Sequence, residues 1–292
     1  AVVAFSTDWR EDAARRDFTM NTLLMDAVGH IYDPTGQGLS DARAGRVVFV
    51  GDPARRIAED VLRILRFFRF HAAYGRGEPD EAGLRACADA AKHIPSLSRE
   101  RITQELLRLL MAPQASATLD LMAQHEILPQ LILPETAQYL SALDDLQTSL
   151  RERTLLPRLW LLLEEGRGSL LRLTARQESD LVKLDNLFKG LVKRAPPLKE
   201  LIYRNEHDMA FAGIFLHQVM TGEQKYAVDE VKALKAWHVP DFPVSGEDIL
   251  ARNVPSGPEV GKLLRAVEDA WIAEEFMTDR DACLAKLDQL LG

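Results

Sequence analysis

The sequence predicts a mainly α-helical protein that opens with a short segment of strand character. Apolar residues recur at helical spacing through most of the chain from residue 52 onward, whereas β-branched residues and turn formers gather in the first fifty residues. The hydrophobic share of 47% and the charged share of 27% are those of ordinary globular proteins. No apolar run approaches the about 18 residues of a membrane span, so we expect no membrane partner.

The first fifty residues predict short strands joined by turns. Residues 1–6 are short and β-branched, residues 25–34 have two apolar arms around Gly29 that are typical of a hairpin, and the run at 47–51 ends in glycine. Residues 33–45 are rich in turn formers. A glycine-rich turn can cradle phosphate. However, a structural turn is the favoured interpretation here, because no lysine follows as a Walker motif requires.

Helices are expected from residue 52 onward. Asp52 can cap the free amides of a helix start, and Pro53 suits its first turn. Helical spacing then predicts further helices at 80–92, 98–111, 115–125, 136–147, 154–165, 176–193, 206–220, 223–237, 246–251, 258–275 and 279–291.

The densest motif is RIAEDVLRILRFFRF at residues 56–70. On one continuous helix its apolar residues share an arc of about 100°; they are Ile57, Val61, Ile64, Leu65 and Phe68. The remaining arc carries Asp60, Arg63, Arg66 and Arg69. Leu62, Phe67 and Phe70 fall among these charges, which indicates that this face lines a cleft.

An aspartate and an arginine three residues apart on such a face offer an acceptor beside a forked donor. Together they can pair with the Watson–Crick edge of a base, and each good bidentate contact is worth about 1–3 kcal/mol of discrimination. Asp60 and Arg63 have this spacing, and Arg66 and Arg69 suit triphosphate oxygens. The alternative is ion pairing within the helix, between Arg63 and either Glu59 or Asp60.

A second motif, EDAARRDFTMNTLLMD, spans residues 11–26. Forked donors and other polar groups crowd beside Phe18 and Met20; they are Arg15, Arg16, Asp17, Thr19 and Asn21. This density suits anion binding. The alternative is a helix start with solvated charges.

Charge and cysteine usage constrain partners and compartment. The net charge of −8 by itself disfavours a polyanion, yet residues 151–204 carry 12 basic and 7 acidic side chains. This basic stretch can follow an RNA backbone by releasing counterions, or it can be a set of solvated helix faces. The two cysteines, Cys87 and Cys283, lie far apart, which favours a reducing compartment and a cytoplasmic protein.

Three segments together resemble the class II tRNA nucleotidyltransferase and bacterial poly(A) polymerase family. They are RRDFTMN at 15–21, DPTGQGLSD at 33–41 and GDPARRIAEDVLRILRFFRF at 51–70. The segments at 96–113 and 242–276 are similar to later parts of the family. The resemblance implies a polymerase-β-like α/β head with few strands and an elongated, all-helical neck, body and tail. The expected divisions are a partial head at 1–51, a base-recognising neck at 52–130 and an RNA-binding body and tail at 131–292.

The resemblance also implies roles for individual residues. Asp60 and Arg63 match the pair that contacts the incoming base, Arg66 and Arg69 match arginines that contact the nucleotide, and Arg16 matches a further nucleotide-binding arginine. Supporting positions are Arg15, Asp17, Asn21, Glu59, Glu100, Arg101 and Glu105.

The activity implied is addition of C, C and A to tRNA 3′ ends from CTP and ATP with Mg²⁺. The family's metal-binding Asp-x-Asp lies upstream of RRDFT, and nothing in residues 1–14 matches it. We therefore expect the catalytic and metal-binding carboxylates to lie outside this chain. We also expect the chain to lack the front of the head and to be inactive alone. One alternative is a poly(A) polymerase or A-adding enzyme. Another is a non-catalytic RNA-binding protein. No oligomeric state is predicted.

Overall fold

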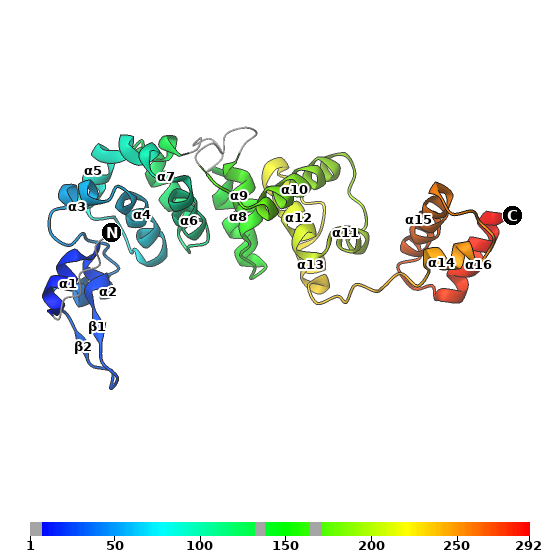
Figure 1. Cartoon of the computed structure of the whole chain (residues 1–292), viewed down its shortest axis with the longest axis horizontal. Helices are drawn as coiled ribbons and strands as arrows, with labels where there is room; N and C mark the ends of the chain where they lie inside the picture. Colours follow the sequence, from blue (N-terminus) through cyan, green and yellow to red (C-terminus); the bar gives the residue numbers. More distant parts are fainter. Residues whose placement is uncertain (1–7, 132–137, 164–170) are drawn as a thin grey trace. The chain divides into compact units, whose positions relative to one another are not determined.

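A computed structural model describes residues 8–131, 138–163 and 171–292 (Figure 1). The chain divides into two compact units. Unit 1 comprises Ala1–Lys189 with Phe215–Glu223, and unit 2 comprises Gly190–Ile214 with Gln224–Gly292. The division into head, neck and body stays a prediction. Within the described ranges, no helix has both the length and the apolar character that crossing a membrane requires.

Unit 1 starts with small elements and continues as a helical array, which confirms the mainly α-helical fold class (Figure 1). The small elements are α1 (Trp9–Arg15), the 3-10 helix η1 (Thr19–Thr22), β1 (Leu24–Met25), β2 (Ile31–Tyr32) and α2 (Gly38–Ala44). The array comprises α3 (Pro53–Glu59), α4 (Leu62–Tyr74), α5 (Glu81–Ala90), η2 (Ala91–Ser96), α6 (Arg99–Leu110), α7 (Ala115–Gln124), η3 (Leu128–Gln130), α8 (Gln138–Ser149), α9 (Leu155–Leu162) and most of α10 (Ala175–Lys193).

The strand predictions have mixed outcomes. The hairpin at 25–34 is confirmed: Leu24 pairs with Tyr32 and Met25 with Ile31, with Gly29 at a φ of 92° in the turn. The run at 47–51 forms only an isolated bridge from Phe49 to Phe18. The predicted strand at 1–6 lies outside the described residues. Residues 33–45, expected as a turn, include α2.

One continuous helix over 56–70 is wrong. Helix α3 ends at Glu59 and α4 begins at Leu62, because Asp60 is extended at φ −155° and ψ 106°. The Asp60 Oδ1 atom accepts a hydrogen bond of 3.1 Å from the Leu62 amide. An aspartate that bonds a nearby backbone amide competes with the helix in this way. Asp60 therefore stands at a junction between two helices.

An aromatic core holds the segment after α1 against α4. Phe18, Phe49 and Phe67 are buried. The Phe49 and Phe67 rings stack with centroids 5.5 Å apart, and the Phe18 ring lies 5.0 Å from that of Phe49. Because α4 also packs on α6 and α7, this core fixes the polar residues beside Phe18 relative to those of α4.

A buried arginine ties the later helices to α6. Arg158 on α9 donates to Gln147 Oε1 over 2.9 Å and to the Leu110 carbonyl over 3.1 Å, and it pairs with Asp144 on α8. These contacts satisfy an otherwise costly buried charge. The bond to Leu110 also satisfies a carbonyl in the last turn of α6, which has no amide of the same helix to accept from.

Unit 2 contains α11 (Leu198–Asn205), the start of α12 (His207–Thr221), α13 (Val228–Leu234), α14 (Gly246–Leu250), α15 (Pro258–Ala273) and α16 (Arg280–Leu291). Its core gathers Ile249, Val267, Trp271 and Leu287. Helix α11 was not predicted, and α13 covers only part of the helix expected at 223–237. Pro197 precedes α11 directly, a position where a proline opens a helix rather than breaking one.

Candidate functional site

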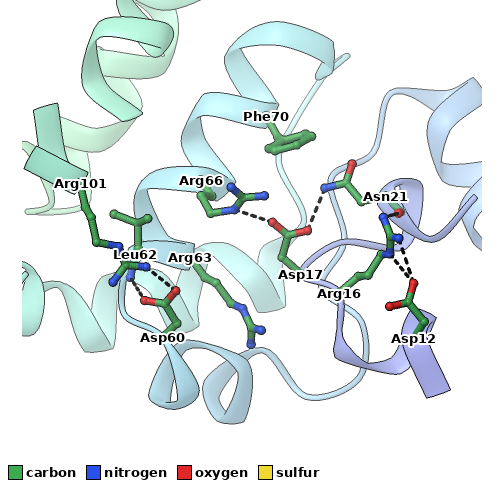
Figure 2. Close-up of a pocket in the computed structure, with 10 residues that line it drawn as sticks. All are labelled: Asp12, Arg16, Asp17, Asn21, Asp60, Leu62, Arg63, Arg66, Phe70 and Arg101. Atoms are coloured by element: carbon green, nitrogen blue, oxygen red, sulfur yellow. Dashed lines mark hydrogen bonds and ion pairs between the residues drawn. The ribbon is translucent and has the colours of Figure 1, made fainter. Parts of the chain in front are cut away.

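A pocket of about 580 Å³ lies in unit 1, between the end of α1, the start of α4 and α6 (Figure 2). Ten residues line it: Asp12, Arg16, Asp17, Asn21, Asp60, Leu62, Arg63, Arg66, Phe70 and Arg101. The structure thus gathers four of the five expected nucleotide-binding residues and three of the supporting ones. The cleft that Leu62 and Phe70 indicated is present. Asp12 was missed, although its place four residues before Arg16 on a helix was a usable signal.

Asp60 presents its carboxylate at the pocket wall from the α3–α4 junction. Its Oδ2 atom accepts a hydrogen bond of 2.7 Å from Arg101 Nη2, while its Oδ1 atom accepts from the Leu62 amide (Figure 2). Arg101 comes from α6, 41 residues further along the chain. Each carboxylate oxygen of Asp60 has a second lone pair, so both can still accept a bond from a ligand.

The Arg63 guanidinium is held by hydrogen bonds to residues of α3 and to the end of α1. Its Nη1 atom donates to Glu59 Oε2 and to the Arg56 carbonyl, both over 2.8 Å, and its Nη2 atom reaches the Arg15 carbonyl at 3.3 Å. The ion pair of Arg63 with Glu59 is therefore present, whereas the carboxylate of Asp60 is paired with Arg101. Hydrogen bonds from Arg63 and Arg56 keep the pKa of Glu59 below its usual value.

Asp17 is the buried anchor of the opposite wall. Burial raises the pKa of its carboxyl, but hydrogen bonds from Asn21 and Arg66 and the charge of Arg66 outweigh it, so the pKa is lowered overall. The two bonds measure 2.8 Å from Asn21 Nδ2 and 2.6 Å from Arg66 Nε (Figure 2). A carboxylate so held keeps its charge and fixes the Arg66 guanidinium beside the pocket.

The other expected residues lie outside the pocket lining. Arg69 donates from Nε to Glu105 Oε2 over 2.5 Å, and its guanidinium carbon lies 4.3 Å from the Phe70 ring centre. Glu105 is buried and also lies 3.8 Å from Arg66 Nη1. Glu100 pairs with Arg172 over 2.8 Å. Arg15 lies 3.9 Å from Glu11.

The pocket is suited to a polyanion that carries a polar edge. Four guanidiniums and three carboxylates line it, which leaves a positive surplus. Guanidiniums bind phosphate oxygens through charge-assisted, often bidentate hydrogen bonds. Across residues 8–131, 138–163 and 171–292, no group of three or more His, Cys, Asp or Glu side chains is arranged to hold a metal ion.

Comparisons with known proteins bear on this pocket. A family model for the poly(A) polymerase head domain matches residues 1–48, and a model described as the probable RNA- and SrmB-binding site of polymerase A matches residues 78–140. Human CCA tRNA nucleotidyltransferase 1, mitochondrial, is 32% identical over 98% of this chain and 68% of its own length. Poly(A) polymerase I of Haemophilus influenzae is 35% identical over 46% of this chain and 29% of its own length.

The fold has a solved counterpart. The Bacillus stearothermophilus CCA-adding enzyme, solved in complex with CTP, superposes with a TM-score of 0.72 over 98% of this chain and 75% of that one, at 23% identity. This likeness shows only that the fold is shared, whereas the similarity to the human relative is one of sequence. Together with the matching head and RNA-binding models, these similarities place the chain in the nucleotidyltransferase family of class II CCA-adding enzymes and bacterial poly(A) polymerases.

Proposed function

We propose that the pocket binds CTP and ATP and that the protein adds C, C and A to the 3′ ends of tRNA. The observation that carries this proposal is the convergence of Asp60 and four arginines in one pocket of a member of this family. A carboxylate acceptor and a guanidinium donor suffice to pair with a base edge, so no nucleic-acid template is needed. The human relative is named for this reaction.

Each wall of the pocket has its own role in the proposal. Asp60 and Arg63 select the base, and Arg101 holds the Asp60 carboxylate in place through their bond of 2.7 Å. Arg16 and Arg66 bind the phosphates and sugar, with Asp17 and Asn21 behind them. Arg69 lies outside the pocket lining, against the Phe70 ring, where Glu105 holds its guanidinium. Glu59 holds Arg63, and Arg15, Glu100 and Glu105 support the surrounding helices.

Two further parts of the proposal concern the metal ion and the compartment. We propose Mg²⁺ as the cofactor, but the described residues contain no group of three or more His, Cys, Asp or Glu side chains arranged to hold it, so no step is assigned to the ion. The RNA 3′ end is the second substrate. The two buried cysteines, both free thiols, support a reducing compartment, which we propose to be the cytoplasm.

Base selection is tested by calorimetric titration of CTP, ATP, GTP and UTP. We expect CTP and ATP to bind more tightly than GTP and UTP, and Arg63→Ala to weaken CTP and ATP binding by about fivefold or more, because one bidentate base contact is worth about 1–3 kcal/mol. Arg85→Ala is the matched control, since Arg85 pairs with Glu81 on the surface of α5. Equal affinity for all four nucleotides, or an Arg63→Ala variant with unchanged preference, contradicts the assignment.

A poly(A) polymerase is the second candidate, because the Haemophilus influenzae relative of that name is 35% identical over 46% of this chain. Product analysis separates the candidates when the protein carries the upstream Asp-x-Asp that the family resemblance implies. With a tRNA that ends at the discriminator base, together with CTP, ATP and Mg²⁺, a CCA end supports the first proposal. A single A or a long A tail selects the second. RNA binding without nucleotide binding identifies a non-catalytic RNA-binding protein and overturns both.

A further inference from the structure

We infer that Asp12 is a positioning residue that holds the Arg16 guanidinium in its nucleotide-binding orientation. This inference rests on the proposed function, because it needs Arg16 to contact the nucleotide. Asp12 lines the same pocket as Arg16. It lies one turn before Arg16, in the first turn of α1.

The contacts fix Arg16 from two sides. Its Nε and Nη2 atoms both donate to Asp12 Oδ2, over 3.0 and 2.9 Å, and its Nη1 atom donates to the Asn21 carbonyl over 3.1 Å (Figure 2). These bonds use three of the five N–H groups of the guanidinium. Two remain for a ligand, one on Nη1 and one on Nη2, and they share the plane that the three bonds define.

Arg16 needs such a restraint more than its neighbours do. Its side chain is 43% exposed, whereas those of Arg63 and Arg66 are 15% and 31% exposed. Arg66 is anchored by the buried Asp17, and Arg63 by Glu59 and two carbonyls. A long arginine side chain loses rotamer entropy on binding, and preorganisation removes that cost from the binding step. Asp12 supplies the only carboxylate contact that the structure shows for Arg16 within the described residues.

The test is a double-mutant cycle on the full chain, read by calorimetric titration with CTP. We expect Asp12→Ala to weaken CTP binding by up to about fivefold, which corresponds to the upper end of the range for an exposed ion pair. We expect Asp12→Glu to restore most of the loss, because it returns a carboxylate at the i, i+4 spacing. In an Arg16→Ala background, Asp12→Ala should have no further effect.

Glu11→Ala is the matched control. Glu11 shares the first turn of α1 and the same favourable place near the helix N-terminus, but it faces Arg15 and does not line the pocket. It should leave CTP affinity unchanged while altering α1 stability as much as Asp12→Ala does. Unchanged or tighter CTP binding by Asp12→Ala overturns the inference, as does an effect that persists without Arg16. If Arg16→Ala itself leaves CTP affinity unchanged, the proposed contact of Arg16 with the nucleotide is wrong, and the inference about Asp12 falls with it.

Discussion

At the scale of single residues, the sharpest prediction concerns Asp17. Its pKa is lower in the folded protein than the ordinary value of 3.8. Its ionised form therefore stabilises the fold above that value, and this contribution disappears as the pH falls through the folded pKa. We expect Asp17→Asn to lower the free energy of unfolding by about 1–3 kcal/mol at pH 7, measured by chemical denaturation. The difference from the parent should shrink below pH 4.

The control for Asp17→Asn is Asp89→Asn, which removes an exposed carboxylate from α5 and should leave stability unchanged. A loss for Asp17→Asn that is the same at pH 7 and at pH 3 would show that the charge is not what matters. The sequence could indicate that Asp17 belongs to a polar cluster beside Phe18. It could not reveal that the partner is Arg66, because that hydrogen bond joins residues 49 positions apart.

At the scale of elements, local patterns predicted best where the interactions are local. The hairpin around Gly29 and most helices follow from turn chemistry and helical spacing. Helical spacing did not predict the break between α3 and α4. The amphipathic pattern is unbroken there, although the Asp60 side chain accepts a hydrogen bond from the Leu62 amide. Its second partner, Arg101, comes from α6. Periodicity cannot report a tertiary contact of this kind, although the resemblance did assign both residues to the site.

Substitutions of two glycines test where the backbone is closely packed and where it is not. A Cβ atom on Gly38, at the start of α2, would lie 2.5 Å from the Thr19 carbonyl oxygen. We expect Gly38→Ala to cost about 1–3 kcal/mol of stability, because backbone must move to make room. A Cβ atom on Gly190, in α10, would meet nothing within 4 Å, so Gly190→Ala should gain up to about 1 kcal/mol from helix propensity. Denaturation midpoints that move in the same direction for both variants would contradict this.

At the scale of the whole molecule, a net charge of −8 requires that RNA contacts be concentrated in few places. Many of the cations in the basic stretch at 151–204 are paired with carboxylates. Arg153 and Arg158 share Asp144, Arg176 and Lys183 share Asp180, and Arg204 pairs with Glu200 and Asp269. Within the described part of this stretch, Lys193 and Arg194 are neighbouring, exposed cations for which no ion pair is present.

These two cations are therefore the sharpest test of RNA binding by the basic stretch. We expect the double substitution Lys193→Ala and Arg194→Ala to weaken tRNA binding and to flatten its salt dependence, since each lost contact with duplex phosphate lowers the log–log slope by about 0.9. Filter binding over a range of salt concentrations measures both effects. Arg176→Ala with Lys183→Ala removes the same charge from a stretch where both cations are paired with Asp180, so it should change tRNA affinity less. Equal losses from the two double variants would mean that only overall charge matters and that no localised phosphate contact exists at the end of α10.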